Sequence, residues 1–410
     1  MNLHKDLRLI YGAAFFRSLG IGLMGVVLGI FLAREGFPAF HIGLIVGSGL
    51  AGSAVGTLFT SLRADRLGRR KTLMMLSLLG ALGGVGLAMS SSFVGMLLLA
   101  FCGMLNSMGS DRGAAFALEQ AVIPQGIPAH RRTAALSWYN LVLDLGHALG
   151  ALMGTLPAVL PLWSSFNLSQ AYKLTFLIYS GCYLLSAIPY FFLSPEIEAK
   201  PTDKPLKLST ESKGIVTRLA MLSGLDSFGG GFLTDALFAY WFFRRFGVSE
   251  ATLGPLFFAA HALNSISYLA AAKLARRIGL VNTMVFTHIP SSLFLIVVPF
   301  APSFPWAAAL FLARESLVEM DVPTRQSYIA AVVRPEERTL ASGVTNLTRN
   351  VSWAVAPSVA GYLMQHLSLA APLFLGGGAK ILYDILLYAA FRRLKPEEEK
   401  SAGAVTCVSG

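Results

Sequence analysis

The stretch of sequence that decides the fold reads DRLGRR and occupies residues 65–70. It is a short polar and basic turn that stands between two strongly apolar runs, at 40–62 and at 72–90. Since about 20 mainly apolar residues are enough for a helix to cross a bilayer, these runs predict two membrane-spanning helices joined by a tight loop. The rest of the chain repeats this pattern of apolar run and short polar loop.

Apolar runs dominate the composition of the whole chain. Of its 410 residues, 54% are hydrophobic and 13% are charged, whereas an average soluble domain carries about 25% charged residues. The mean hydropathy of +0.61 agrees. So much apolar surface requires lipid as its solvent. We expect an all-α membrane protein with about twelve transmembrane helices, at 9–33, 40–62, 72–90, 93–121, 134–157, 173–193, 218–243, 252–272, 283–300, 306–329, 340–364 and 372–392.

Lysine and arginine gather in alternate loops between these runs. One set of loops holds most of them, namely Arg63, Arg66, Arg69, Arg70, Lys71, Arg131, Arg132, Lys273, Arg276, Arg277, Arg334 and Arg338. Because cytoplasmic loops carry the excess of basic residues, we expect a multi-pass protein of the cytoplasmic (plasma, or bacterial inner) membrane with both termini cytoplasmic. In this setting the net charge of +11 indicates contact with anionic membrane lipids, and no nucleic acid partner is expected.

An internal repeat divides the chain into two related halves. At a shift of 206 residues, Gln120 matches Gln326 and Arg132 matches Arg338, at corresponding places in the helix order. Repeats of this kind are typical of secondary transporters. We expect an N-terminal six-helix bundle at 1–193, a cytoplasmic linker at 194–217, a C-terminal six-helix bundle at 218–394 and a disordered cytoplasmic tail at 395–410.

The loop at 65–70 resembles a signature of the major facilitator superfamily, roughly G-x-x-x-D-R-x-G-R-R between its second and third helices. Ser61 stands in place of the first glycine. The predicted topology, linker and repeat are also similar to that family over nearly the whole chain. The resemblance implies two pseudo-symmetric bundles that open alternately to either side of the membrane, and a central cavity lined by helices one, four, seven and ten.

The same resemblance implies a gate at the cytoplasmic face. In the family, the carboxylate at the position of Asp65 meets the start of helix eleven, which we expect near Thr339 or Leu340. Arg69 would reach Glu119 at the end of helix four, because the arginine fork suits a carboxylate. We therefore expect the following residues to act in gating: Asp65, Arg66, Gly68, Arg69 and Glu119.

Many charged residues fall inside the predicted spans, where each one costs about 2.5–3.5 kcal/mol on insertion scales. Most of them must therefore face a water-filled cavity or pair inside the bundle. Those on the four cavity-lining helices of the family are the candidates for substrate binding or proton coupling: Arg17, Asp111, Arg112, Asp226, Asp235, Arg314, Glu315, Glu319 and Asp321. Such a concentration suits a polar, charged or zwitterionic solute.

A buried carboxyl group among these candidates is expected to carry a coupling proton. In a low-dielectric cavity a carboxyl group holds its proton to a higher pH than in water, so it can load and release a proton near neutral pH. We expect one of four carboxylates to do so, Glu315 first and then Asp226, Asp235 or Glu319. Asp226 and Asp235 lie about half a turn out of phase, so only one faces the cavity unless the glycines at 229–231 bend the helix.

Structural pairing is the alternative for several of these charges. Arg112 and Glu119 share one helix face, and Lys380 lies four residues before Asp384, so each pair is able to form an ion pair within its own helix. Other residues are favoured as structural pairs at the interface between halves: Asp144, Arg349 and Asn350. The histidines of the spans are expected to act in packing or hydrogen bonding: His147, His261 and His288.

No catalytic constellation stands out. The sequence has no G-x-x-x-x-G-K phosphate loop and no nucleophile–base set, and its three cysteines suggest neither a disulfide framework nor a metal site. We expect no enzyme activity, no cofactor and no metal. The fifth-helix pattern of the family's proton antiporters is degraded, with Ala151 and Thr155 in place of proline and glycine.

We therefore expect a monomeric secondary active transporter that moves a small polar or charged solute by alternating access. Its coupling to protons is expected through a buried carboxylate, and efflux by antiport is favoured because the loop at 65–70 is common among exporters. The alternatives are solute uptake by proton symport or facilitated diffusion and, from another class, a non-transporting membrane receptor or scaffold with the same fold.

Overall fold

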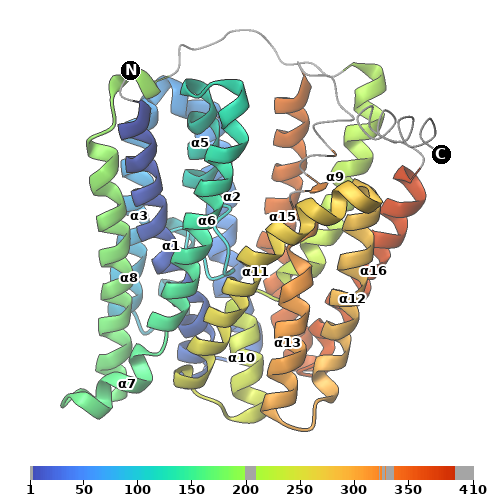
Figure 1. Ribbon diagram of the computed structural model, residues 1–410. Helices are drawn as coiled ribbons and strands as arrows, with labels where there is room; N and C mark the ends of the chain where they lie inside the picture. Colours follow the sequence, from blue (N-terminus) through green and yellow to red (C-terminus); the bar gives the residue numbers. More distant parts are fainter. Residues whose placement is uncertain (1–2, 199–208, 323, 326–327, 329–336, 393–410) are drawn as a thin grey trace. The chain divides into compact units, whose positions relative to one another are not determined.

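The computed structural model describes the chain apart from residues 1–2, 199–208, 323, 326–327, 329–336 and 393–410. The predicted tail at 395–410 and the middle of the predicted linker therefore lie outside the described residues. Within the remainder, helices follow one another and no strand occurs (Figure 1). The all-α membrane fold expected from the sequence is confirmed.

Most predicted spans are continuous helices that extend a few residues beyond the apolar runs. They are α1 (Leu3–Arg34), α2 (Ala39–Leu67), α3 (Arg69–Met89), α8 (Leu168–Phe191), α11 (Glu250–Ile278), α12 (Leu280–Val297), α15 (Arg338–His366) and α16 (Ala371–Phe391). Among the helices of the described part, six are by themselves long and apolar enough to cross a membrane. Local signals fix some helix ends: the side chain of Asn167 accepts a hydrogen bond from the Gln170 amide at 2.9 Å and so caps α8.

Four predicted spans are interrupted, which corrects the expectation of continuous helices. Their pieces are α4 (Phe93–Cys102) with α5 (Ala114–Val122), α6 (Ala129–Met153) with α7 (Leu156–Trp163), α9 (Thr210–Gly231) with α10 (Asp235–Phe246), and α13 (Phe304–Val318), which ends in a turn at 319–320. The axes of α6 and α7 meet at 44°. Glycine stands at three of the breaks, as Gly103, Gly154 and Gly231, and glycine accommodates backbone that other residues resist.

The longest interruption, at 103–113, replaces the middle of the predicted fourth span. Gly109 has a φ of +82°, which favours glycine. The side chain of Asn106 holds the loop together, because its Nδ2 donates to the Ser110 carbonyl and its Oδ1 accepts from the Met108 amide, both at 2.9 Å. The Ser107 carbonyl accepts from the Ala236 amide of α10 at 3.2 Å. These bonds satisfy backbone groups that a bilayer would leave unpaired.

The chain forms two compact units. The first contains Met1–Asp203, Gly231–Ala262 and Trp353–Pro372, and the second contains Lys204–Gly230, Leu263–Ser352 and Leu373–Gly410. The first unit therefore combines the predicted N-terminal bundle with α10, the beginning of α11 and the end of α15. The residues of α9, α12, α13 and α16 lie almost wholly in the second unit.

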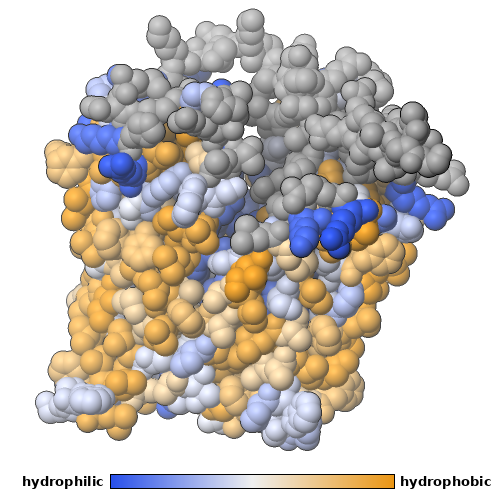
Figure 2. Space-filling view, in the orientation of Figure 1, coloured by the Kyte–Doolittle hydropathy of each residue, from blue (hydrophilic) through white to orange (hydrophobic). Residues whose placement is uncertain are grey.

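Each unit has its own hydrophobic core. In the first unit the core includes Ile10, Leu73 and Leu118, and in the second it includes Met284 and Leu387. Large apolar side chains are also exposed on the helices, as Figure 2 shows in the orange areas of the surface. Lipid is the expected neighbour of such side chains in a membrane protein.

Close backbone contacts join α2 to the end of α15 inside the first unit. A Cβ atom at Gly43 would overlap the Pro357 carbonyl oxygen, and one at Gly361 would overlap the Ala39 carbonyl oxygen. At Gly47 it would lie 2.8 Å from the Ala354 carbonyl oxygen. Small residues at such crossings let membrane helices approach closely, so larger side chains at these positions would force the helices apart.

Candidate functional site

The predicted charges of the first unit gather around Arg17 on α1. Its side chain is buried, with a relative exposure of 3% for the residue. The guanidinium donates through Nε to Asp111 Oδ2 at 2.6 Å and through Nη2 to Glu119 Oε2 at 2.5 Å. It also donates through Nη1 to the Tyr190 hydroxyl of α8 at 2.6 Å. Arg17 thus joins the interrupted fourth span to α1 and α8.

Glu119 on α5 is the most enclosed member of this network. Its exposure is 0%, and two tyrosines add to the contact with Arg17. The Tyr139 hydroxyl of α6 donates to Oε2 at 2.7 Å, and the Tyr190 hydroxyl donates to Oε1 at 2.6 Å. Donors of this number stabilise the ionised carboxylate. The ion pair of Glu119 is therefore formed with Arg17, whereas the sequence suggested Arg112 or Arg69 as its partner.

A cavity of about 30 Å³ with both polar and apolar lining residues adjoins this network inside the first unit. Arg17 and Asp111 line it, together with Ser53, Asn106 and Tyr183. A cavity needs roughly 10–15 Å³ of such volume to hold one water molecule, so this one has room for a water or two. Polar side chains on several helices are what a bound water requires.

Arg112, the neighbour of Asp111, lies near an aromatic ring of α15. Its Cζ atom lies 5.7 Å from the centre of the Trp353 ring, a cation–π distance. Both residues belong to the first unit. Arg112 remains a candidate for contact with a solute.

In the second unit the charges gather around Asp226 on α9. Lys380 Nζ lies 3.0 Å from Oδ1, and Arg349 Nη1 lies 3.2 Å from Oδ2. Arg325 Nη1 lies 3.5 Å from the same oxygen. Asp226 is 4% exposed. This carboxylate therefore has permanent cations from three separate parts of the sequence as partners.

Two further carboxylates complete the second network. Asp321 pairs with Arg325, and Asp384 Oδ2 lies 3.0 Å from His288 Nδ1. His288 Nε2 lies 3.2 Å from Lys380 Nζ. The predicted pair of Lys380 with Asp384 is wrong, because each residue has a partner on another helix. Three carboxylates face three permanent cations here, so the network is balanced before His288 is counted.

A smaller polar group lies between α11 and α13 in the second unit. Asn264 Nδ2 donates to Glu315 Oε2 at 3.1 Å, and Arg314 pairs with its neighbour Glu315. The Tyr268 hydroxyl donates to Glu319 Oε2 at 3.3 Å. The structure thus brings Glu315 and Glu319 to the same helix pair, as the sequence indicated. Asn264 Oδ1 has no hydrogen-bond partner among the described residues, which leaves an acceptor for a ligand.

Asp226 and Asp235 belong to different units because the seventh span is broken between them. Asp235 is the first residue of α10 in the first unit, and its Oδ2 lies 3.1 Å from His261 Nε2 of α11. The glycines at 229–231 that precede the break include Gly231, the last residue of α9. The half-turn offset predicted for a straight helix therefore does not apply.

The DRLGRR loop is held by its own residues and by the segment that follows α8. Arg69 Nε donates to Asp65 Oδ1 at 2.7 Å, and Arg69 Nη1 donates to the Ile197 carbonyl at 3.2 Å. Glu198 accepts from the Arg69 amide at 2.6 Å, at the start of α3 where amides lack helical partners. Gly68 has a φ of +97°, and Arg66 is exposed. Sequence patterns gave no signal for Glu198.

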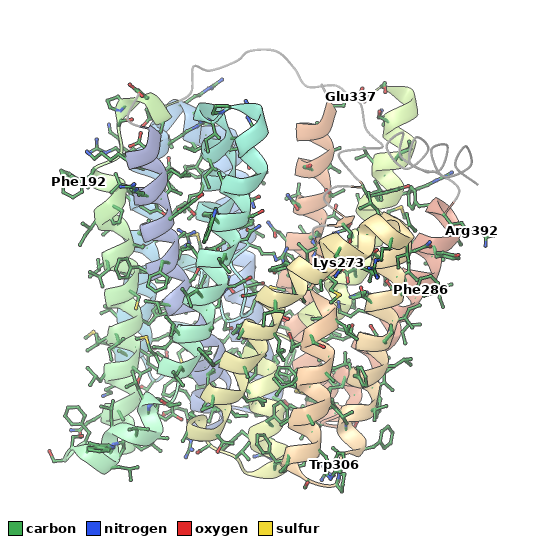
Figure 3. The ribbon with its side chains drawn as sticks, in the orientation of Figure 1. Phe192, Lys273, Phe286, Trp306, Glu337 and Arg392 are labelled. Atoms are coloured by element: carbon green, nitrogen blue, oxygen red, sulfur yellow. The ribbon has the colours of Figure 1, made fainter. Side chains whose placement is uncertain are left out.

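In the second unit, a carboxylate likewise accepts a hydrogen bond from a backbone amide at the start of a helix, here α9. Glu337, labelled in Figure 3, accepts from the Ser209 amide at 2.6 Å. A carboxylate beside the first amides of a helix complements the positive end of its dipole. The predicted start of helix eleven, near Thr339, agrees with α15, which begins at Arg338.

A further ion pair joins the C-terminal end of α1 to the N-terminal end of α11 in the first unit. Arg34 Nη2 lies 3.3 Å from Glu250 Oε2, and the Tyr172 hydroxyl donates to the other oxygen of Glu250. Glu250 is fully buried. The Cζ atom of Arg34 lies 5.2 Å from the centre of the Phe243 ring on α10. The sequence patterns did not single out this group, because its members stand at span ends, where charges are common.

Known proteins match this chain along its whole length. Residues 10–318 and 220–406 match the family model described as Major Facilitator Superfamily. An uncharacterized membrane protein of Saccharomyces cerevisiae is 27% identical over 421 residues, covering 94% of this chain and 94% of the yeast protein. A solved nucleoside transporter has a TM-score of 0.72 at 12% identity and covers 93% of this chain and 100% of that one. A D-xylose–proton symporter has a TM-score of 0.70 at 17% identity and covers 93% and 96%.

Proposed function

Since the chain belongs to the major facilitator superfamily of membrane transporters, we propose that it moves a small polar or charged solute across the cytoplasmic membrane by alternating access, driven outward by protons. The family expected from the DRLGRR loop is thereby confirmed. The solute, the proton and the direction are the parts of this function that we propose.

The observation that carries the proposal is the pair of buried charge networks. Arg17 with Glu119 in the first unit and Asp226 with Arg325 in the second belong to spans one, four, seven and ten. These spans line the central cavity in the family. Ionised groups are costly at this depth, and a transporter of purely apolar cargo would have no use for them. They therefore support a polar solute.

Polar groups beside these networks are the proposed contacts for the solute. In the second unit, Asn264 Oδ1 has no hydrogen-bond partner among the described residues. The other end of the same amide, Nδ2, donates to Glu315. In the first unit, Asp111 lines the cavity beside Arg17, and Arg112 is its neighbour in the sequence. The solved relatives named above transport a nucleoside and a sugar with a proton. Hydroxyl-bearing solutes of that size are therefore the first to test.

Alternating access requires contacts that break when one side opens. We assign the outer gate to the ion pair of Arg34 with Glu250 and to the glycine contacts of α2 with α15. The inner gate is assigned to Asp65, Arg66, Gly68 and Arg69, with Asp65 meeting the start of α15 in the outward-open state. The contact of Arg69 with Glu119 remains a prediction for that state.

The boundaries of the two bundles and the orientation also stay as proposed from the sequence. The bundles at 1–193 and 218–394 would be joined by a cytoplasmic linker at 194–217, with both termini cytoplasmic and with membrane lipids around a monomer. Efflux is favoured because the DRLGRR loop is common among exporters. Uptake by proton symport or facilitated diffusion is the second candidate, and the proton symporter among the solved relatives favours it.

Among the four carboxylates proposed to carry the proton, the contacts now favour Asp235 over Glu315. Asp226 faces Lys380 and Arg349, and Glu315 pairs with Arg314, so each has a permanent cation as a partner. Asp235 forms an ion pair with His261, and a histidine itself gains and loses a proton.

A ligand screen on purified protein tests the proposal. Thermal unfolding would be measured with D-xylose, uridine, a dicarboxylate and a hydrophobic cation as probes. The proposal expects a raised melting temperature with at least one polar probe, since a ligand that binds only the folded state stabilises it. Stabilisation by the hydrophobic cation alone would overturn the polar solute class.

A further inference from the structure

A second set of ionisable side chains lies in the first unit, apart from the Arg17 network. Asp144 and His147 are one turn apart on α6, with Asp144 Oδ1 3.7 Å from His147 Nδ1. The centre of the His147 ring lies 5.8 Å from that of His261 on α11. His261 Nε2 lies 3.1 Å from Asp235 Oδ2 at the start of α10. The row of side chains therefore connects α6 to α10 through α11.

His147 is buried without the hydrogen bonds that its ring requires. Its exposure is 2%, neither ring nitrogen has a hydrogen-bond partner in the described part of the chain, and Asp144 Oδ2 also has none. A neutral imidazole carries an N–H on one nitrogen, and a buried donor without a partner is unfavourable. A proton added to the ring makes it a cation beside the Asp144 carboxylate, and the two charges then stabilise each other.

The kind of partner separates Asp144 and Asp235 from the carboxylates that pair with arginine or lysine. Asp111 and Glu119 pair with Arg17, which is always charged. The ion pairs that the structure gives for Asp144 and Asp235 are with histidine, whose charge changes between about pH 5 and pH 8. With both histidines neutral the set carries two negative charges, and two bound protons make it neutral. Proton uptake therefore neutralises the set. Asp384 in the second unit also pairs with a histidine, His288, but that ring lies 3.2 Å from the permanent cation Lys380.

Two glycines lie close to Asp235. A Cβ atom at Gly25 of α1 would lie 2.9 Å from the Asp235 Cβ, and one at Gly109 of the loop at 103–113 would overlap the Asp235 carboxylate. On the other side, a Cβ atom at Gly22 would overlap the His147 carbonyl oxygen. The carboxylates in ion-pair contact with the two histidines in the described part of the chain include Asp144 from α6 and Asp235 from α10.

We propose that Asp144, His147, His261 and Asp235 form the binding site of the coupling proton. The inference rests on the proposed function, because it assigns residues to the proton that drives transport. Protonated His147 pairs with Asp144, and protonated His261 pairs with Asp235. His147 belongs to the predicted N-terminal half and His261 to the C-terminal half, so movement of α6 away from α11 separates the histidines and exposes the protons to release.

Direct titration of the histidines tests this site with the proton alone as the probe. The full chain, labelled with ¹⁵N-histidine and held in lipid nanodiscs, would be followed by NMR from about pH 5 to about pH 9. His147→Gln and His261→Gln identify the two ring signals. We expect both rings to titrate. We also expect Asp235→Asn to lower the proton affinity of His261, and Asp144→Asn that of His147, each by about tenfold or more.

Two histidines elsewhere provide matched controls. His288 is buried beside Asp384 in the second unit, and His366 is exposed at the end of α15. Neither should shift in Asp235→Asn or Asp144→Asn, and unchanged spectra at these positions also report that the variants fold. If one variant fails to fold, the other still tests its own histidine.

A His147 ring that stays neutral over the whole range, or a His261 affinity that is unchanged in Asp235→Asn, would overturn the site. The titration needs no solute, so that outcome leaves the proposed transport standing. Failure of the proposed function is seen separately, as solute flux in proteoliposomes that ignores a pH gradient while both histidines titrate as expected.

Discussion

Glu119 and Arg325 occupy matching positions in the internal repeat, 206 residues apart, and each pairs with a buried charge of opposite sign on another helix. Glu119 Oε2 lies 2.5 Å from Arg17 Nη2, and Arg325 Nη1 lies 3.5 Å from Asp226 Oδ2. The two units therefore use the same repeat position with the signs exchanged. Each unit places ionised groups of both signs within the membrane, which suits a transporter of polar or charged solutes.

Removal of Arg17 is expected to destabilise the protein strongly. Arg17→Met leaves Asp111 and Glu119 buried without a cation, and breaking a buried ion pair by removing one partner typically costs about 3–5 kcal/mol. The measurement is the free energy of unfolding in detergent or lipid. Arg17→Met with Glu119→Gln should recover part of the loss, and Arg63→Ala, at an exposed site, is the control. Equal stability of Arg17→Met and wild type would contradict the network.

Loss of the outer ion pair is expected to favour opening at that end. Glu250→Gln removes the charge that faces Arg34 at 3.3 Å. The closed state of the outer gate is then stabilised only by the proposed glycine contacts of α2 with α15, so it should be less populated. Spin labels at Glu35 and Arg245, which are exposed, would report a larger population of long distances. Lys173→Gln, also at an exposed site near this end, is the matched control. An unchanged distance distribution in Glu250→Gln rules out this gate.

The DRLGRR loop is expected to control the inner gate through Asp65. Asp65→Asn removes the anion that we propose to meet the unpaired amides at the start of α15 in the outward-open state, and such a contact is worth about 0.3–1 kcal/mol and up to about 2 kcal/mol when partly buried. The inward-open population should rise and turnover should slow, with little change in solute binding. Distances between labels at the cytoplasmic ends of α2 and α15 measure this. Asp65→Asn with wild-type distances and rate would remove the basis for the latch.

The orientation in the membrane has its own test. Cysteines placed in the linker at 194–217 and after Lys395 should react only with a reagent supplied from the cytoplasmic side, because cytoplasmic loops carry the excess of basic residues. The native cysteines would first be replaced and the variants checked for normal unfolding temperatures. Labelling of either position from outside would reverse the proposed topology.

The sequence predicted where helices lie better than where they break. Apolar runs locate the spans because any stretch that crosses lipid must be apolar and helical. The break at 103–113 depends on contacts from elsewhere, such as the Ala236 amide that donates to the Ser107 carbonyl. Glycine alone does not reveal such a break, because glycine is frequent in unbroken membrane helices as well.

The sequence was also a better guide to which charged residues are buried than to which of them form ion pairs. Burial follows from position within an apolar run, and Arg17, Asp226 and Glu315 are all buried. Pairing depends on tertiary neighbours: the four-residue spacing of Lys380 and Asp384 favoured a pair, yet Lys380 pairs with Asp226. The tyrosines that enclose Glu119 come from two other helices, α6 and α8, and tyrosine in an apolar run carries no signal of such a role.

The measurement that tests the central claim most directly is solute flux in proteoliposomes with and without a pH gradient. The solute would be the polar probe that gives the greatest thermal stabilisation, and an ionophore that dissipates the gradient is the control. The account predicts accumulation against a concentration gradient that disappears with the ionophore and in Asp235→Asn, while solute exchange persists in that variant. Accumulation that is unchanged by the ionophore would contradict proton-coupled transport.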